Sequence, residues 1–130
     1  MLDVEVELPR STTGPRAARH AITRLCGDHA DPEALADAQL LVSELASNAV
    51  VHGNGAVVLR ARVEPEHDRL HVELVDQGCG FARQVDRDGP PRVGGWGLEF
   101  VEQLSNRWGV REGSTHVWFE LSLSRSRQHG

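Results

Sequence analysis

The sequence contains no lysine and no tyrosine, so all 14 of its Lys and Arg positions are arginine. The absence of lysine excludes a P-loop, a Schiff-base enzyme and the protein-kinase fold, each of which needs a lysine at its active centre. Only two cysteines occur, Cys26 and Cys79, and they form no C-x-x-C pair. This pattern argues against a disulfide framework and a structural zinc site, and it is typical of a reducing cytoplasm.

The chain also lacks long apolar runs and an excess of positive charge. Its net charge of -5 would release few counterions on DNA, so we expect no direct nucleic-acid binding. No apolar stretch approaches about 18 residues and the N-terminus is acidic and alternating, so we expect no membrane span and no signal peptide. With 130 residues the chain has the length of one domain. We expect a cytoplasmic protein whose single domain covers residues 1–124, with a frayed tail at 125–130.

Apolar periodicity divides the chain into strands and helices. Alternation predicts strands, and spacing of three or four residues predicts helices. The expected strands are 2–8, 57–63, 70–74, 107–112 and 116–123, and the expected helices are 15–29, 32–52 and 98–104. This order predicts a two-layer α/β sandwich, with a mixed sheet of about five strands and three helices on one face. The strand at 2–8 would be a free edge, which makes a homodimer possible.

The first motif that carries chemistry is ELASNAVVHG, at the end of the long central helix. Glu44 and Asn48 are four residues apart and therefore share one helix face, with His52 one turn further on. An amide oxygen suits Mg²⁺, which prefers oxygen ligands and keeps several waters, and the carboxylate could polarise a hydroxyl beside the ion. The alternative interpretation is a solvated helix face without function.

Two further motifs are rich in glycine. In VDQGCG, strand parity directs Asp76 inward, where the exocyclic amine of a purine would satisfy the carboxylate, while Gly78 and Gly80 let the backbone approach a planar ring. In GGWGL, Gly95 and Gly97 open a helix whose backbone N–H groups can hold phosphate oxygens. The alternatives are an ordinary glycine turn after a strand and a flexible loop before a helix.

In this order and at these spacings, the three motifs resemble the N, G1 and G2 boxes of the GHKL ATPase superfamily. The chain is most similar to the small single-domain branch, the anti-sigma factor serine kinases of actinobacterial type, with LSNRWGV and STHVWFEL extending the resemblance toward Leu123. The resemblance implies a Bergerat-type ATP-binding fold with ATP and Mg²⁺ as cofactors. It also implies that residues 81–94 form a lid over the nucleotide.

The resemblance assigns roles to particular residues. Glu44 would be the general base, and Asn48 would carry the Mg²⁺ that bridges the phosphates. His52 would either reach the nucleotide or bond to carbonyls at its helix end. The ATP-binding residues implied by the resemblance are Asn48, His52, Asp76, Gly78, Gly80, Gly95, Gly97, Leu98 and Thr115.

Two positions depart from the pattern of many relatives. Val51 stands where they have Arg or Lys, and His116 stands where they have Thr, with Thr115 one residue earlier. The other histidines, at positions 20, 29, 67, 71 and 129, are expected at the surface. Trp108 and Trp118 are expected to be structural.

The resemblance implies a serine/threonine kinase that phosphorylates an anti-anti-sigma protein of the STAS type and thereby controls a sigma factor. Val51 and His116 favour a first alternative, a module that binds ATP or a partner without phosphoryl transfer. A second alternative is a stand-alone histidine-kinase-type catalytic domain that transfers phosphate to a histidine of another chain.

Overall fold

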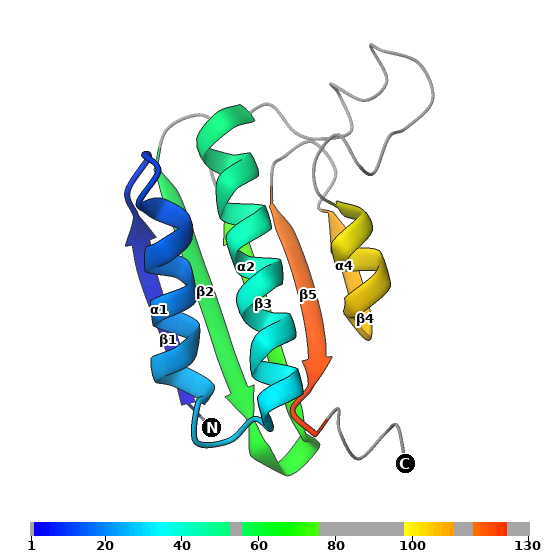
Figure 1. Cartoon of the computed structure of the whole chain (residues 1–130). Coiled ribbons are helices and arrows are strands. Elements are labelled where there is room, and N and C mark those ends of the chain that lie inside the picture. Colours follow the sequence, from blue (N-terminus) through cyan, green and yellow to red (C-terminus); the bar gives the residue numbers. More distant parts are fainter. Residues whose placement is uncertain (1, 53–55, 76–97, 111–115, 125–130) are drawn as a thin grey trace.

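A computed structural model of the chain describes residues 2–52, 56–75, 98–110 and 116–124. Strands and helices follow in the expected order along these residues (Figure 1). They are β1 (Leu2–Leu8), α1 (Gly14–Cys26), α2 (Pro32–His52), β2 (Val57–Glu64), the 3-10 helix η1 (Pro65–His67), β3 (Arg69–Val75), α4 (Leu98–Leu104), β4 (Arg107–Val110) and β5 (Val117–Ser122). Most ends lie close to the predicted ones; α1 ends at Cys26 rather than at His29.

The five described strands form one sheet in the order β1-β2-β3-β5-β4. Every neighbouring pair is antiparallel, so the expectation of a mixed sheet was wrong. The reason is that two helices, rather than one, connect β1 with β2. A single helix would return the chain for a parallel strand, whereas α1 and α2 reverse its direction twice. β1 lies at one edge of the sheet, as predicted, and β4 lies at the other.

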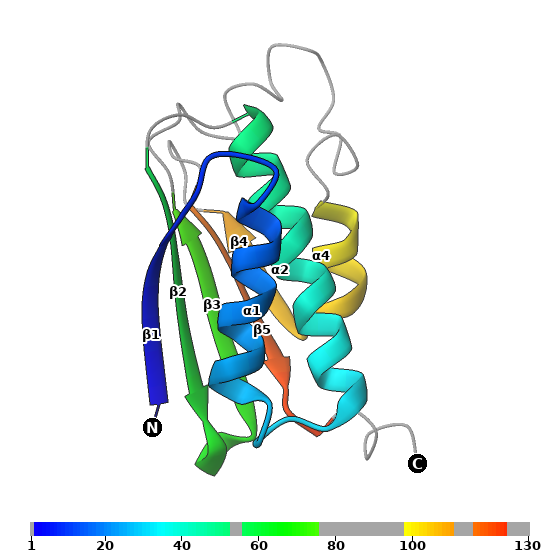
Figure 2. The same ribbon diagram turned by 60° about the vertical axis from the view of Figure 1, so that its left-hand side comes forward.

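The three described α-helices cover one face of this sheet and leave the other face open (Figure 2). α2 lies between α1 and α4, and its predicted apolar stripe faces the sheet. Of that stripe Leu35 is partly buried, whereas Ala38, Val42, Leu45, Ala46 and Ala49 are buried. The strands contribute alternate residues to the same core, and Phe119 of β5 is fully buried within it. The predicted two-layer sandwich is therefore confirmed.

Local interactions fix where the central helix begins. The Asp31 Oδ1 atom accepts a hydrogen bond of 2.8 Å from the Ala34 backbone N–H. This carboxylate satisfies one of the N–H groups that have no partner within the helix, and its charge complements the helix dipole. The predicted Asp-Pro start of α2 is thus confirmed.

Asp68 connects two elements at the end of the sandwich opposite to the C-terminal end of α2. Its backbone adopts a left-handed conformation (φ 52°) in the turn between β2 and β3. Its carboxylate accepts hydrogen bonds from the hydroxyls of Ser122 and Ser124, at 2.8 and 2.7 Å. These bonds tie the β2–β3 turn to the end of β5.

Candidate functional site

Four described element ends meet at one end of the sandwich, which is the upper end in Figure 1. α2 ends there at His52, and β3 ends there at Val75. α4 begins there at Leu98 and β5 begins there at Val117, which pairs with Leu74 of β3. In the sequence these ends border the three motifs and Thr115. The fold thus brings the borders of all three motifs to one end of the molecule.

Glu44 and Asn48 are the two predicted site residues whose side chains the structure describes. Both are partly buried and lie one turn apart on α2. The Nδ2 atom of Asn48 is buried and forms no hydrogen bond with the described residues. A buried amide without a partner costs about 1–3 kcal/mol, so this position favours a ligand that supplies the missing partner.

The chemistry of this pair fits the cofactors that the motifs imply. Turning a carboxamide by half a rotation exchanges its oxygen and its nitrogen, so Asn48 can present an acceptor to a cation or a donor to a phosphate oxygen. Mg²⁺ takes oxygen ligands and is commonly held by one or two protein groups together with substrate phosphates. Asn48 and Glu44 are therefore suited to MgATP at this end of α2.

Arg10 supports the same end of α2, and sequence reasoning missed it. Its guanidinium donates hydrogen bonds to the backbone oxygens of Ala49 and Val50, at 2.9 and 3.0 Å. A cation is favourable at a helix C-terminus, where carbonyls have no partner within the helix. No local pattern reveals this contact, because the two partners lie 39 and 40 residues further along the chain.

Gly14 lets the chain pass closely over this end of α2. A Cβ atom added at Gly14 would lie 2.5 Å from the Pro9 oxygen and 3.3 Å from Cγ2 of Val50. Only glycine fits such a close approach without a shift of the backbone. The turn after β1 is thereby packed against the helix that carries Glu44 and Asn48.

Several predicted positions are not tested by the described residues. His52 is the last residue of α2 and Leu98 is the first of α4, but the side chains of both lie outside the description, as does that of Val51. The remaining predicted positions, all outside the described residues, are Asp76, Gly78, Gly80, Gly95, Gly97 and Thr115, together with the expected lid at 81–94 and Cys79.

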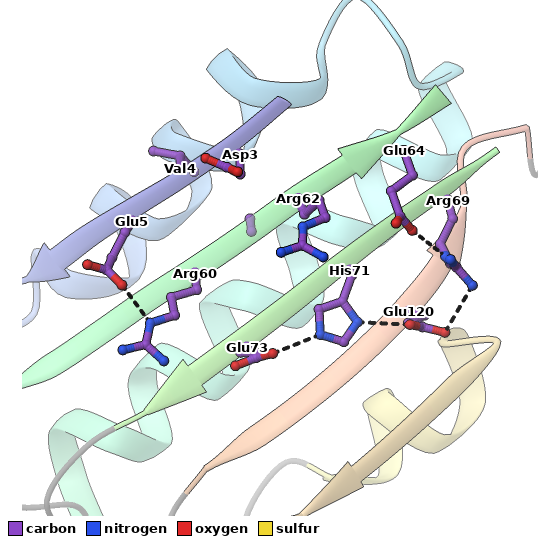
Figure 3. Close-up of a pocket in the computed structure, with 11 residues that line it drawn as sticks. Asp3, Val4, Glu5, Arg60, Arg62, Glu64, Arg69, His71, Glu73 and Glu120 are labelled. Carbon is purple, nitrogen blue, oxygen red and sulfur yellow. Dashed lines mark hydrogen bonds and ion pairs between the residues drawn. The ribbon is translucent and has the colours of Figure 1, made fainter. Parts of the chain in front are cut away.

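Four polar side chains on the open face of the sheet form a connected row, which sequence reasoning also missed. We call it the His–Glu row, and it consists of His116, Glu73, His71 and Glu120. The Nε2 atom of His116 lies 2.9 Å from Glu73 Oε1, and the Nε2 atom of His71 lies 3.0 Å from Glu73 Oε2. The Nδ1 atom of His71 lies 2.9 Å from Glu120 Oε2 (Figure 3).

Two arginines and a tryptophan support the row. Oε1 of Glu120 is buried and lies at ion-pair distance from the guanidinium groups of Arg107 and Arg69, at 3.5 and 4.0 Å. The ring of His71 stacks on Trp118 with a centroid distance of 5.8 Å, and Arg107 lies over the same tryptophan. Trp118 is thus structural, as expected. His71 lies on the open face, and its contacts in the row leave its side chain 26% exposed.

Burial and hydrogen bonding act in opposite directions on Glu73. Burial alone would raise the pKa of this carboxyl, but the hydrogen bond from His71 and the charges of His116 and His71 outweigh it. The net effect lowers the pKa of Glu73 below its ordinary value of 4.5. Glu73 is therefore ionised at neutral pH and attracts both neighbouring histidines.

A second feature outside the motifs is a groove of about 720 Å³ between β1 and α1. Its apolar lining consists of Val4, Val6, Pro9, Ala17, Ala21 and Leu25. Arg16, His20 and Arg24 line it from α1, and all three are exposed. Neither arginine forms an ion pair or hydrogen bond with the described residues, and α1 contains no acidic residue. The groove therefore combines an apolar floor with a basic rim on the α1 side and one carboxylate, Asp3, on the β1 side.

Cys26 has a thiol that is unsuited to act as a nucleophile. It is buried in the core, its thiol donates a hydrogen bond to the Ile22 oxygen, and burial raises its pKa to about 11. Across the described part of the chain, no three His, Cys, Asp or Glu side chains are arranged to hold a metal ion. None of the helices that can be described is both long and apolar enough to cross a membrane.

A sheet covered on one face by helices, with a carboxylate and a carboxamide on the central helix near the meeting point of the element ends, is compatible with a nucleotide-binding domain of the ATPase type. The comparison with protein families agrees. The chain belongs to the histidine kinase-like ATPase domain family, whose model matches residues 8–121. This match spans every predicted site residue and confirms the GHKL assignment made from the three motifs.

Among solved structures, the chain is similar to the RsbU and RsbW domains of Rv1364c from Mycobacterium tuberculosis. The TM-score is 0.68 at 20% sequence identity, and the match covers 95% of this chain. It covers 32% of the other chain, so this protein spans about a third of that structure. The likeness establishes the shared fold. No curated protein gives a match.

Proposed function

We propose that this protein is a regulatory serine/threonine kinase of the anti-sigma type, which transfers phosphate from MgATP to a small anti-anti-sigma partner. The observation that carries the proposal is the Glu44 and Asn48 pair, one turn apart on α2, with the buried Asn48 amide nitrogen lacking a partner among the residues that the structure describes. The family of ATPase domains to which the chain belongs supports ATP as the ligand. The likeness to a chain that contains an RsbW domain supports the regulatory branch.

Within this proposal, the two residues of α2 divide the chemistry. Mg²⁺, when bound, would neutralise charge on the phosphates and align them for in-line transfer. Asn48 would hold the ion through its amide oxygen. Glu44 would accept the proton of the attacking serine hydroxyl, which is the role of a general base. Arg10, by binding the carbonyls of Ala49 and Val50, would keep this part of α2 in place.

The remaining contacts of the nucleotide follow from the family resemblance and are part of the proposal. Asp76 would bind the adenine amino group, with Gly78 and Gly80 against the ring. Gly95, Gly97 and Leu98 would hold phosphates at the start of α4. His52 and Thr115 would complete the site from α2 and from the residues before β5. We propose a cytoplasmic location for this activity.

The test is a phosphorylation assay with MgATP and candidate STAS-type proteins from the source genome. We expect acid-stable phosphoserine or phosphothreonine on one of them, and a fall of about 10²–10⁴-fold in rate for Glu44→Gln. Asn48→Ala should weaken MgATP binding, whereas Gln39→Ala, another amide on α2, should not. Glu33→Gln is the matched control for the carboxylate. Acid-labile phosphate on a partner would instead indicate transfer to histidine.

A second candidate function is a binding module that acts through contact without phosphoryl transfer. The groove between β1 and α1 favours it, because an apolar floor with the basic rim of Arg16, His20 and Arg24 suits an acidic, amphipathic segment of a partner. A sigma factor or anti-anti-sigma protein that binds equally well with and without MgATP, and acquires no phosphate, would support it. Arg16→Glu should then abolish binding, while Arg62→Glu on the open face of the sheet should not.

A further inference from the structure

The hydrogen bonds of the His–Glu row determine how many hydrogens the ring nitrogens of His71 must carry. His71 contacts one carboxylate through each ring nitrogen, Glu73 through Nε2 and Glu120 through Nδ1. An ionised carboxylate can only accept hydrogen bonds, so each of the two nitrogens must carry a hydrogen. Only the protonated imidazolium carries both. The row as observed is therefore complete only while His71 is positively charged.

His116 extends the row to the start of β5. It is the residue immediately before this strand, its side chain is only 14% exposed, and its Nε2 atom is bonded to Glu73 of β3. A single carboxylate thus accepts hydrogen bonds from both histidines, one on its own strand and one across the sheet. The contact of His116 with Glu73 joins the residue before β5 to β3 close to the end of that strand, and His71 holds the same carboxylate.

These strand ends border the proposed nucleotide site. Asp76 follows β3 directly in the sequence, and Thr115 precedes His116 directly. Because the row lies on the open face, none of its four members contacts the face under the helices. They would act on a nucleotide through the spacing of the strand ends rather than by touching it.

Charged groups of both signs surround the row. On β2, Arg60 and Arg62 stand opposite Glu73 and His71 in the register, and Arg60 is paired with Glu5 of β1 at 2.6 Å. Around Glu120 the other charged groups are Arg107 of β4 and Arg69 of β3, the latter paired with Glu64. The two carboxylates of the row are the charged groups that His71 contacts directly, at 3.0 and 2.9 Å.

We propose that His71 and His116 are positioning residues whose protonation fixes the ends of β3 and β5, so that nucleotide affinity falls as pH rises through the histidine range. The proposal rests on the nucleotide site described under Proposed function. When His71 loses one proton, a nitrogen lone pair faces a carboxylate and one bond of the row is replaced by repulsion. When His116 loses its charge, a charge-assisted hydrogen bond becomes an ordinary one. Both changes loosen the strand ends.

The experiment is calorimetric titration of the full chain with ADP and Mg²⁺, at about pH 6 and about pH 8.5, which bracket the ordinary histidine range. We expect the wild type to bind about threefold to tenfold more weakly at the higher pH than at the lower, beyond any change seen in the variants. His71→Gln and His116→Gln keep an N–H donor that does not titrate, and each should flatten this dependence. His29→Gln, at an exposed histidine between α1 and α2, is the matched control and should retain it.

A second measurement tests the protonation of His71 in the absence of any nucleotide. Nitrogen-detected NMR of the histidine rings, without ligand, should show a hydrogen on both ring nitrogens of His71 at about pH 6. A neutral His71 at this pH would overturn the proposal, as would equal pH dependence in the wild type and both variants. Absence of ADP binding at either pH would instead refute the nucleotide site, and the NMR result would then still report on the row.

Discussion

The two faces of the sheet are built from alternate residues of the same strands, yet different physics stabilises them. In β5, Phe119 points under the helices and is fully buried, while its neighbours Trp118 and Glu120 lie on the open face. The covered face consists of apolar side chains that pack against three helices. The open face carries ion pairs and hydrogen bonds, among them those of His71, Glu73 and Glu120 in the His–Glu row (Figure 3).

The difference shows what each face contributes to the molecule. Burial of apolar area is non-directional and large, at about 25 cal/mol per Å², so the covered face provides most of the stability. Hydrogen bonds and ion pairs on a solvated face contribute little net free energy, but they demand particular partners at particular distances. The open face is therefore better suited to setting the geometry and pH response of the molecule than to holding it together.

The largest effect is expected from removing a side chain of the covered face. Phe119→Ala should lower the free energy of unfolding by about 3–5 kcal/mol, because it leaves a cavity between β5 and the helices. Urea denaturation followed by circular dichroism measures it. Phe119→Leu, which leaves a smaller cavity, is the matched control and should lose clearly less. A loss below about 1 kcal/mol for the alanine variant would contradict the division between the faces.

The next effect concerns the adjacent residue on the open face. Glu120→Ala removes the carboxylate that His71 and Arg107 share, and we expect a loss of about 1–3 kcal/mol in the free energy of unfolding. This value should remain below that of Phe119→Ala in the same urea series. Glu120→Gln keeps the shape and one acceptor and should lose less. An equal loss for Glu120→Ala and Phe119→Ala would show that the open face stabilises the fold as strongly as the core.

A smaller, pH-dependent effect is expected for Glu73→Gln. The pKa of Glu73 is lower in the folded chain than its ordinary value of 4.5, so the folded state binds fewer protons here than the unfolded one. The stabilisation is present above pH 4.5 and is lost as pH falls through the folded pKa. Wild type should exceed the variant by about 1 kcal/mol at neutral pH and converge with it in acid. Unfolding curves across this range measure the difference, and a constant gap would contradict it.

The same contrast explains what the sequence could predict. Period-two alternation predicted β2, β3 and β5, and helical spacing predicted α2, because the covered face repeats at fixed intervals along the chain. Sheet pairing was predicted less well. The parallel component expected of the sheet was wrong because direction depends on how many helices intervene, which is a property of the path rather than of any window of residues.

The candidate site likewise contains residues whose arrangement could be predicted from the sequence and residues whose arrangement could not. Glu44 and Asn48 were predictable because both lie on one helix, where a spacing of four fixes their relation. Arg10 and the His–Glu row were not, because their partners are distant in the sequence; His116 and Glu73, for example, are 43 residues apart. Such contacts depend on which strands become neighbours, and β5 pairs with β3 although α4 and β4 lie between them in the sequence.

The smallest effect is expected at the edge of the open face, where Arg60 of β2 is paired with Glu5 of β1 at 2.6 Å. Their side chains are 53% and 63% exposed, so water and salt screen the pair strongly. A double-mutant cycle with Glu5→Gln and Arg60→Gln should give a coupling of about 0.2–1 kcal/mol at low salt, falling toward zero at high salt. The same cycle with Glu120 and His71 should give a larger coupling that salt reduces less, because those side chains are only 13% and 26% exposed. Equal couplings with equal salt dependence would mean that the row is no more than another surface ion pair, and its proposed hold on the ends of β3 and β5 would lose its physical basis.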